Sequence, residues 1–127
     1  MPIFDPPSFE TGEIVIVPFP YSDKFAEKRR PAVVVSNARL AKEGFLWIVM
    51  VTSSINRGKT FDRQIADLAL SGLSAPSIVR PTKIANVEPS RVIRRAGRLG
   101  AAEVADVLKS VRSFINSRRI AGAAKQK

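Results

Sequence analysis

The sequence predicts a mainly β protein with some α structure, ending in a single amphipathic helix. Short runs rich in valine and isoleucine follow one another between turn-forming residues, too closely for alternating strands and helices. A helical apolar stripe begins only at about residue 101. With 127 residues and 45% hydrophobic content, we expect one domain over residues 1–116 and a basic, flexible tail at 117–127.

The first three predicted strands, at 14–17, 32–35 and 45–51, are apolar at consecutive positions. Strands without alternation need cover on both faces. A sheet rolled into a barrel, a docked helix or a second copy of the chain could each supply it. Weaker strand signals follow at 65–70, 77–80, 83–87 and 91–94.

The predicted helix covers about 101–116. Its apolar positions recur with a helical period, and acidic residues precede basic ones, as the helix dipole prefers. The stripe consists of Val104, Val107, Leu108, Val111, Phe114 and Ile115. We assign it to packing rather than to chemistry.

Composition limits the chemistry. The chain contains no cysteine and no histidine, so disulfides and thiolate metal sites are excluded, and the commonest general base is missing. Catalysis would have to use arginine, lysine, carboxylates, hydroxyls or the single tyrosine. We expect no metal and no other cofactor.

The net charge of +10 favours a polyanionic partner, nucleic acid above all. Part of this charge lies in the predicted tail, at Arg118, Arg119, Lys125 and Lys127. The sequence has neither a signal-peptide pattern nor an apolar run of the roughly 20 residues that span a bilayer. A cytoplasmic protein is the expectation.

The most informative motif is Arg29-Arg30-Pro31, directly before an apolar strand. Proline pushes the preceding residue toward an extended conformation, which would hold Arg30 at the mouth of that strand. A fixed guanidinium suits a phosphate or a carboxylate. The alternative is a solvated basic turn that begins at Lys28.

Other candidates each have two interpretations. Phe19, between two prolines, could stack on a base or fill the core. Thr52 and Ser53, after the longest apolar strand, could donate to a phosphate or cap a turn. Arg80 could line an RNA groove or lie at a strand edge.

Together, these motifs resemble the PemK/MazF-like toxins of type II toxin–antitoxin systems over about residues 12–116. The segments that carry the resemblance are 12–15, 18–20, 29–36, 52–53, 76–80 and 98–99. The resemblance implies a small SH3-like β-barrel with a C-terminal helix, usually a homodimer. It also implies a metal-independent endoribonuclease that cuts single-stranded RNA and is inhibited by a cognate antitoxin, which we expect to be acidic because the chain is basic.

Carried over residue by residue, the catalytic pair is Arg30 and Thr52, and Glu27 matches an acidic residue that could act as an auxiliary acid or base. The region after Arg80 lacks an acid-plus-glutamine pair found in some members, which bears on substrate preference. We predict RNA contacts from Lys28, Arg29, Phe19, Ser53 and Arg80. The alternatives are a non-catalytic barrel that binds RNA or protein, and a gyrase inhibitor related to the CcdB-like toxins.

Overall fold

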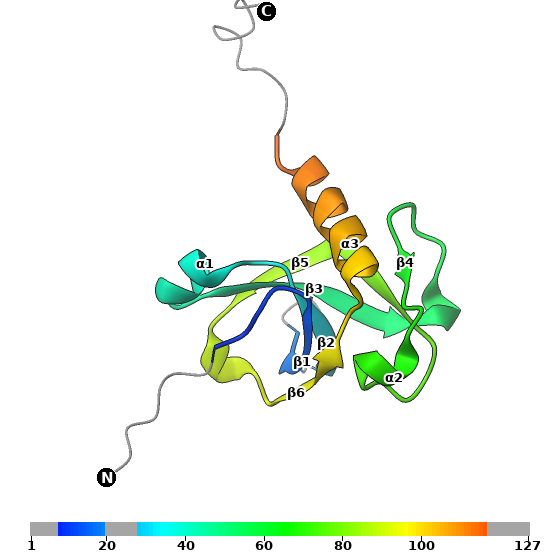
Figure 1. Cartoon of the computed structure of the whole chain (residues 1–127), viewed down its shortest axis with the longest axis horizontal. Helices are drawn as coiled ribbons and strands as arrows, with labels where there is room; N and C mark the ends of the chain where they lie inside the picture. Colours follow the sequence, from blue (N-terminus) through cyan, green and yellow to red (C-terminus); the bar gives the residue numbers. More distant parts are fainter. Residues whose placement is uncertain (1–7, 20–27, 117–127) are drawn as a thin grey trace, which may run out of the picture.

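The computed structural model describes residues 8–19 and 28–116, and these form a curled six-stranded sheet with a helix at its C-terminal end (Figure 1). The sheet is antiparallel, with the order β4-β5-β3-β2-β1-β6. Its strands are β1 Glu13–Pro18, β2 Arg29–Val34, β3 Leu46–Ser53, β4 Arg63–Gln64, β5 Ser77–Val87 and β6 Arg94–Arg98. The predicted mainly β class is confirmed, and the sheet curls into a half-barrel.

Short helical segments connect the strands, and the longest helix follows β6. The segments are α1 Ala38–Lys42, η1 Ser54–Asn56, α2 Leu68–Ser71, η2 Pro89–Arg91 and α3 Ala101–Phe114. The helix predicted at 101–116 is therefore found, ending at Phe114. None of the described helices is long and apolar enough to cross a membrane.

Three strand predictions need correction. The run at 91–94 lies at the end of η2 and before β6, and only Arg94 belongs to a strand. The runs at 77–80 and 83–87 form one strand, β5, because a register shift against β3 between Val49 and Met50 accommodates the residues between them. The run at 65–70 is not a strand. Asp67 caps α2 by accepting from the Leu70 N–H, and Gly72 ends the helix with a φ of 73°. These local capping signals outweigh the apolar content of the run.

Both faces of the sheet are buried, which explains the strands without alternation. One face packs against α3 through a cluster that includes Ile14, Val33, Val49, Val107 and Val111. The other face is covered by the curl of the sheet itself. That cluster includes Phe9, Val15, Val17, Phe19, Ala32, Val34, Ile48 and Met50.

Glu103 fixes the start of α3. It is 5% exposed, and its carboxylate accepts from the Gly100 N–H at 3.1 Å and from the Ala66 N–H. A buried carboxylate needs such donors. This side chain therefore ties the first turn of the helix to the loop between β4 and α2.

The end of α2 lies directly against β6. A Cβ atom at Gly97 would overlap the Leu70 carbonyl oxygen, and one at Gly72 would overlap the Ala96 carbonyl oxygen. Both contacts are between backbone segments. Space therefore requires glycine at both positions, and at Gly72 the φ of 73° requires it as well.

Candidate active site

The sheet brings Arg30 and Thr52 to the same place. Arg30 lies opposite Val17 on β1, and on its other side β2 pairs with β3 through Ala32 and Met50. Continuing that antiparallel register by two residues brings Arg30 level with Thr52. Side chains on a strand alternate between faces, so both point to the face of Ala32 and Met50. The predicted pair therefore shares one face at the end of two neighbouring strands.

Arg30 is half-buried and incompletely bonded. Its Nε atom is buried and has no hydrogen-bond partner among the residues that the structure describes. An unpaired buried donor costs about 1–3 kcal/mol. The guanidinium therefore retains bonding capacity that an anionic oxygen could satisfy.

The two basic neighbours of Arg30 are more exposed. Arg29 lies opposite Pro18 at the start of β2, and Lys28 precedes it. The Lys28 carbonyl accepts from the Phe19 N–H at 3.1 Å, which joins the chain on either side of residues 20–27. Glu27 lies outside the described residues.

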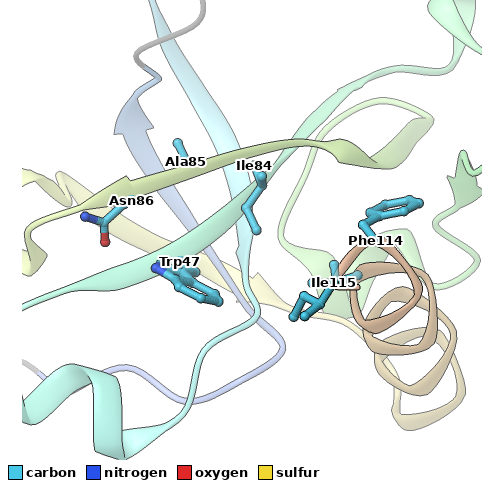
Figure 2. A pocket seen from close by; sticks show the side chains of 7 residues that line it. Trp47, Ile84, Ala85, Asn86, Phe114 and Ile115 are labelled. Atoms are coloured by element: carbon cyan, nitrogen blue, oxygen red, sulfur yellow. The ribbon is translucent and has the colours of Figure 1, made fainter. Parts of the chain in front are cut away.

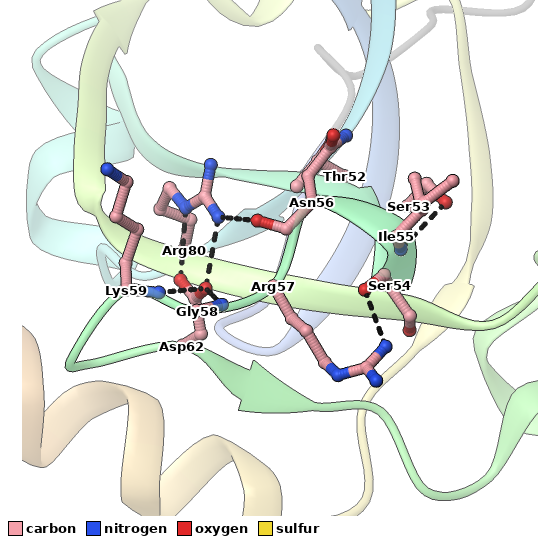
Figure 3. A network of polar contacts seen from close by, with 10 residues as sticks. All are labelled: Thr52, Ser53, Ser54, Ile55, Asn56, Arg57, Gly58, Lys59, Asp62 and Arg80. Atoms are coloured by element: carbon pink, nitrogen blue, oxygen red, sulfur yellow. Dashed lines mark hydrogen bonds and ion pairs between the residues drawn. The ribbon is translucent and has the colours of Figure 1, made fainter.

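Thr52 and Ser53 both take part in the turn after β3 (Figure 3). Thr52 is 8% exposed, and its Oγ1 accepts from Asn56 Nδ2 at 3.0 Å. The Ser53 Oγ accepts from the Ile55 N–H and so caps η1. The capping interpretation holds for Ser53, and its exposed side remains open to solvent.

Arg80 is not an exposed groove residue. It is 9% exposed, and its Nε and Nη2 atoms form a bidentate pair with the Asp62 carboxylate, both at 3.0 Å (Figure 3). Nη2 also donates to the Asn56 carbonyl at 2.7 Å, while Asp62 accepts from the Gly58 and Lys59 N–H groups. The charge of Arg80 is thus neutralised within the protein, which favours a structural role, and its contact with RNA stays a prediction.

This pairing shifts both pKa values. The hydrogen bond from Arg80 lowers the pKa of Asp62, against the opposing effect of burial. The same hydrogen bond raises the pKa of Arg80. Both groups therefore stay charged at neutral pH.

The prediction that Phe19 stacks on a base needs correction. Its side chain is fully buried and belongs to the core cluster with Val15 and Val17. No ring surface is left for stacking on a base. The core interpretation of this aromatic residue is the one the structure supports.

Asn56 and Asp62 were missed by sequence reasoning. No pattern in the sequence singles out Asn56, since its bond to Thr52 joins positions that only the turn of η1 brings together. Asp62 had a signal: a lone arginine inside an apolar strand needs a buried acidic partner. The described residues contain no group of three or more His, Cys, Asp or Glu side chains placed to hold a metal ion.

A separate apolar pocket of about 390 Å³ lies between the sheet and the end of α3 (Figure 2). Trp47 and Ile84 border it from the sheet, and Phe114 and Ile115 border it from the helix end. None of the predicted site residues lines it. The pocket is therefore distinct from the Arg30–Thr52 region.

Comparison with known proteins identifies the class. Residues 10–115 match the family described as the PemK-like, MazF-like toxin of type II toxin–antitoxin systems. Because the match spans most of the chain, this protein belongs to that family. No curated protein has a matching sequence.

Solved structures share the fold at low identity. MazF from Deinococcus radiodurans is 23% identical with a TM-score of 0.67, covering 84% of this chain and 94% of that one. A MazE–MazF structure from the same organism gives 22% and 0.65, with coverages of 86% and 96%. An endoribonuclease in complex with its cognate antitoxin, from a mycobacterial species, gives 15% and 0.65, with coverages of 84% and 97%.

Proposed function

We propose that this protein is the toxin of a toxin–antitoxin pair and acts in the cytoplasm as a metal-independent endoribonuclease on single-stranded RNA. The observation that carries the proposal is the guanidinium of Arg30, whose buried Nε is unpaired among the described residues. The register of β2 and β3, continued by two residues from Ala32 and Met50, brings Arg30 opposite Thr52. The family match and the net charge of +10 support the proposal.

The chemistry needs neither histidine nor metal. RNA carries its own nucleophile, the 2′-hydroxyl, which attacks the adjacent phosphorus as the bond to the 5′-oxygen breaks. The products are a 2′,3′-cyclic phosphate and a 5′-hydroxyl. Arg30 binds the scissile phosphate and assists protonation of the leaving oxygen, and Thr52 donates to a phosphorane oxygen.

The proton of the 2′-hydroxyl needs an acceptor. Arginine rarely gives up its proton, since the guanidinium is a very weak acid. Glu27, Asp23, water and Arg30 itself are the candidates. A pH profile of cleavage separates a carboxylate, which titrates in the acidic range, from the others.

Polar and charged residues beside Arg30 and Thr52 bind the RNA that flanks the cleaved bond. Arg29 and Lys28 are exposed next to Arg30, and Ser53 is exposed next to Thr52. We assign these three to RNA binding and leave out Phe19 and Arg80, which are buried. Their contacts would be with phosphates and therefore indifferent to sequence.

The partners proposed are a second copy of this chain and an acidic antitoxin. Similar proteins of known structure include a MazE–MazF complex and an endoribonuclease with its cognate antitoxin. A negatively charged segment that folds on binding would match the basic surface and cover Arg30. Reversing Lys28 and Arg29 to glutamate should weaken such a complex.

The test is cleavage of a long single-stranded RNA in EDTA, with both new ends mapped. We expect cyclic phosphate and 5′-hydroxyl ends, and no cut at a position that carries a 2′-deoxy sugar. Arg30→Ala should lower the cleavage rate about a hundredfold to a thousandfold. Arg39→Ala, which removes the same charge from the exposed surface of α1, should not.

Two results would contradict the proposal. RNA that binds but stays intact at excess protein would indicate a non-catalytic binding module. Cleavage by Arg30→Ala at the wild-type rate would remove the proposed site.

A further inference from the structure

We infer that Asn56 is a positioning residue, which turns the Thr52 hydroxyl so that its proton faces the substrate. The inference rests on the proposed function, because it concerns how Thr52 donates to the phosphate. Asn56 itself need not touch RNA. Its effect is transmitted through one hydrogen bond.

The direction of that hydrogen bond is the first argument. Asn56 Nδ2 donates to Thr52 Oγ1 at 3.0 Å. A threonine hydroxyl has one proton to donate and two lone pairs that accept. With one lone pair taken by an amide donor, the proton must point elsewhere. Within the described residues, no hydrogen bond from this hydroxyl is found, so the proton is available.

Two other buried hydroxyls, those of Ser71 and Ser77, behave differently. Ser71 Oγ donates to the Leu68 carbonyl at 2.6 Å, and Ser77 Oγ donates to the Ala75 carbonyl at 2.8 Å. Their protons are used by the fold. Ser36, near the start of β3, accepts from the Trp47 N–H, far along the strand from Arg30.

The second argument is that the backbone of Asn56 is itself fixed by hydrogen bonding. Its carbonyl accepts from Arg80 Nη2 at 2.7 Å, and Arg80 is clamped by Asp62 (Figure 3). Asp62 also accepts from the Gly58 and Lys59 N–H groups. The bonds form one chain from β5 through the loop to Thr52. A buried ion pair thus fixes the backbone of the residue that orients the hydroxyl.

Two variants change the side-chain bond and leave the Asn56 carbonyl in place. Asn56→Leu removes the donor at similar volume. Asn56→Asp supplies an acceptor, so the Thr52 proton should turn toward residue 56 and away from RNA. Both should lower kcat about tenfold to a hundredfold. KM should change no more than in Ile55→Asp, a charge control on the exposed neighbouring side chain.

A double-mutant cycle tests whether Asn56 acts through Thr52. Adding Asn56→Leu to Thr52→Val should cause no further loss, because the hydroxyl to be oriented is already gone. An equal loss in both backgrounds would overturn the positioning role while leaving the proposed function intact. A wild-type protein that cleaves no RNA would overturn both.

A measurement without RNA tests the bond directly. The side-chain amide resonances of Asn56 should shift in Thr52→Val, which removes the accepting oxygen, and stay unchanged in Ser113→Ala, which removes an exposed hydroxyl from α3. Thermal unfolding of Asn56→Leu within a few degrees of wild type would show that the kcat loss is not a folding defect. Unchanged Asn56 resonances in Thr52→Val would overturn the inference.

Discussion

Arg80 and Asp62 form a bidentate ion pair that joins β5 to the loop before β4. Their side chains are 11% and 7% exposed. Arg30, on β2, has no such partner among the described residues. Burial and pairing thus distinguish an arginine that holds the fold together from one that is available to a ligand.

Breaking this pair should destabilise the protein strongly. Arg80→Met leaves the Asp62 carboxylate without its counter-charge, which costs about 3–5 kcal/mol for a buried pair. The double variant Asp62→Asn, Arg80→Met should recover part of the loss, because no buried charge remains unpaired. Urea unfolding measures both free energies. A single variant as stable as the double would contradict the pairing.

The same pair predicts a pH dependence. The pKa of Asp62 is lowered from 3.8 in the folded protein, so the stabilisation is complete above that value and is lost as the pH falls below it. The free energy of unfolding should therefore fall more steeply between about pH 5 and pH 2 in wild type than in the double variant. Parallel curves would show that Asp62 contributes nothing to the acid sensitivity.

Phe19 should matter for stability rather than for RNA. Phe19→Ala opens a cavity in a packed cluster and should cost about 3–5 kcal/mol. Phe19→Leu fills most of that space and should cost much less, although it removes the aromatic ring. If the leucine variant folds well but binds RNA markedly more weakly, the ring does contact bases and the core assignment is incomplete.

Arg30 should show the opposite behaviour. Arg30→Met removes a buried donor that has no partner among the described residues, so unfolding free energy should stay the same or rise. Cleavage should fall about a hundredfold to a thousandfold, since a donor to the transition state is lost. Chemical denaturation and single-turnover cleavage measured on one preparation check both parts. A large loss of stability would mean that Arg30 is structural.

Glu103 should contribute far more to the free energy of unfolding than Asp106, one turn further along the same helix. Glu103→Ala leaves the Gly100 and Ala66 N–H groups without their acceptor and should cost about 2 kcal/mol or more. Asp106→Ala removes only an exposed ion pair with Arg63 and should cost less than about 1 kcal/mol. Equal melting temperatures for the two variants would contradict a stabilising role for the hydrogen bonds that Glu103 accepts.

The residues that were predicted well carry local signals. The valine-rich strands and the α3 stripe follow from periodicity, and Arg30 is held extended by the proline after it. Phe19 was predicted to contact RNA, although a local signal for the core was present, because it continues the alternation of Val15 and Val17 into the same cluster.

Other features depend on residues far apart in the sequence. Arg80 finds its partner 18 positions earlier, in a loop without periodicity. The conformation of the run at 65–70 depends on the two residues that cap α2, Asp67 and Gly72, rather than on its apolar residues. The bond from Asn56 to Thr52 requires the geometry of a turn, which residue types alone do not specify.

The absence of a side chain at Gly97 has a consequence for the width of a neighbouring groove. Leu70 and Gly97 both line a surface groove that includes Glu13 and Arg95, and they lie in backbone contact. Any larger residue at this position must push α2 outward from β6. In related chains, the residue that aligns with Gly97 should therefore indicate the separation of α2 and β6. Glycine should accompany backbone contact between them, and a bulkier residue should accompany a wider separation.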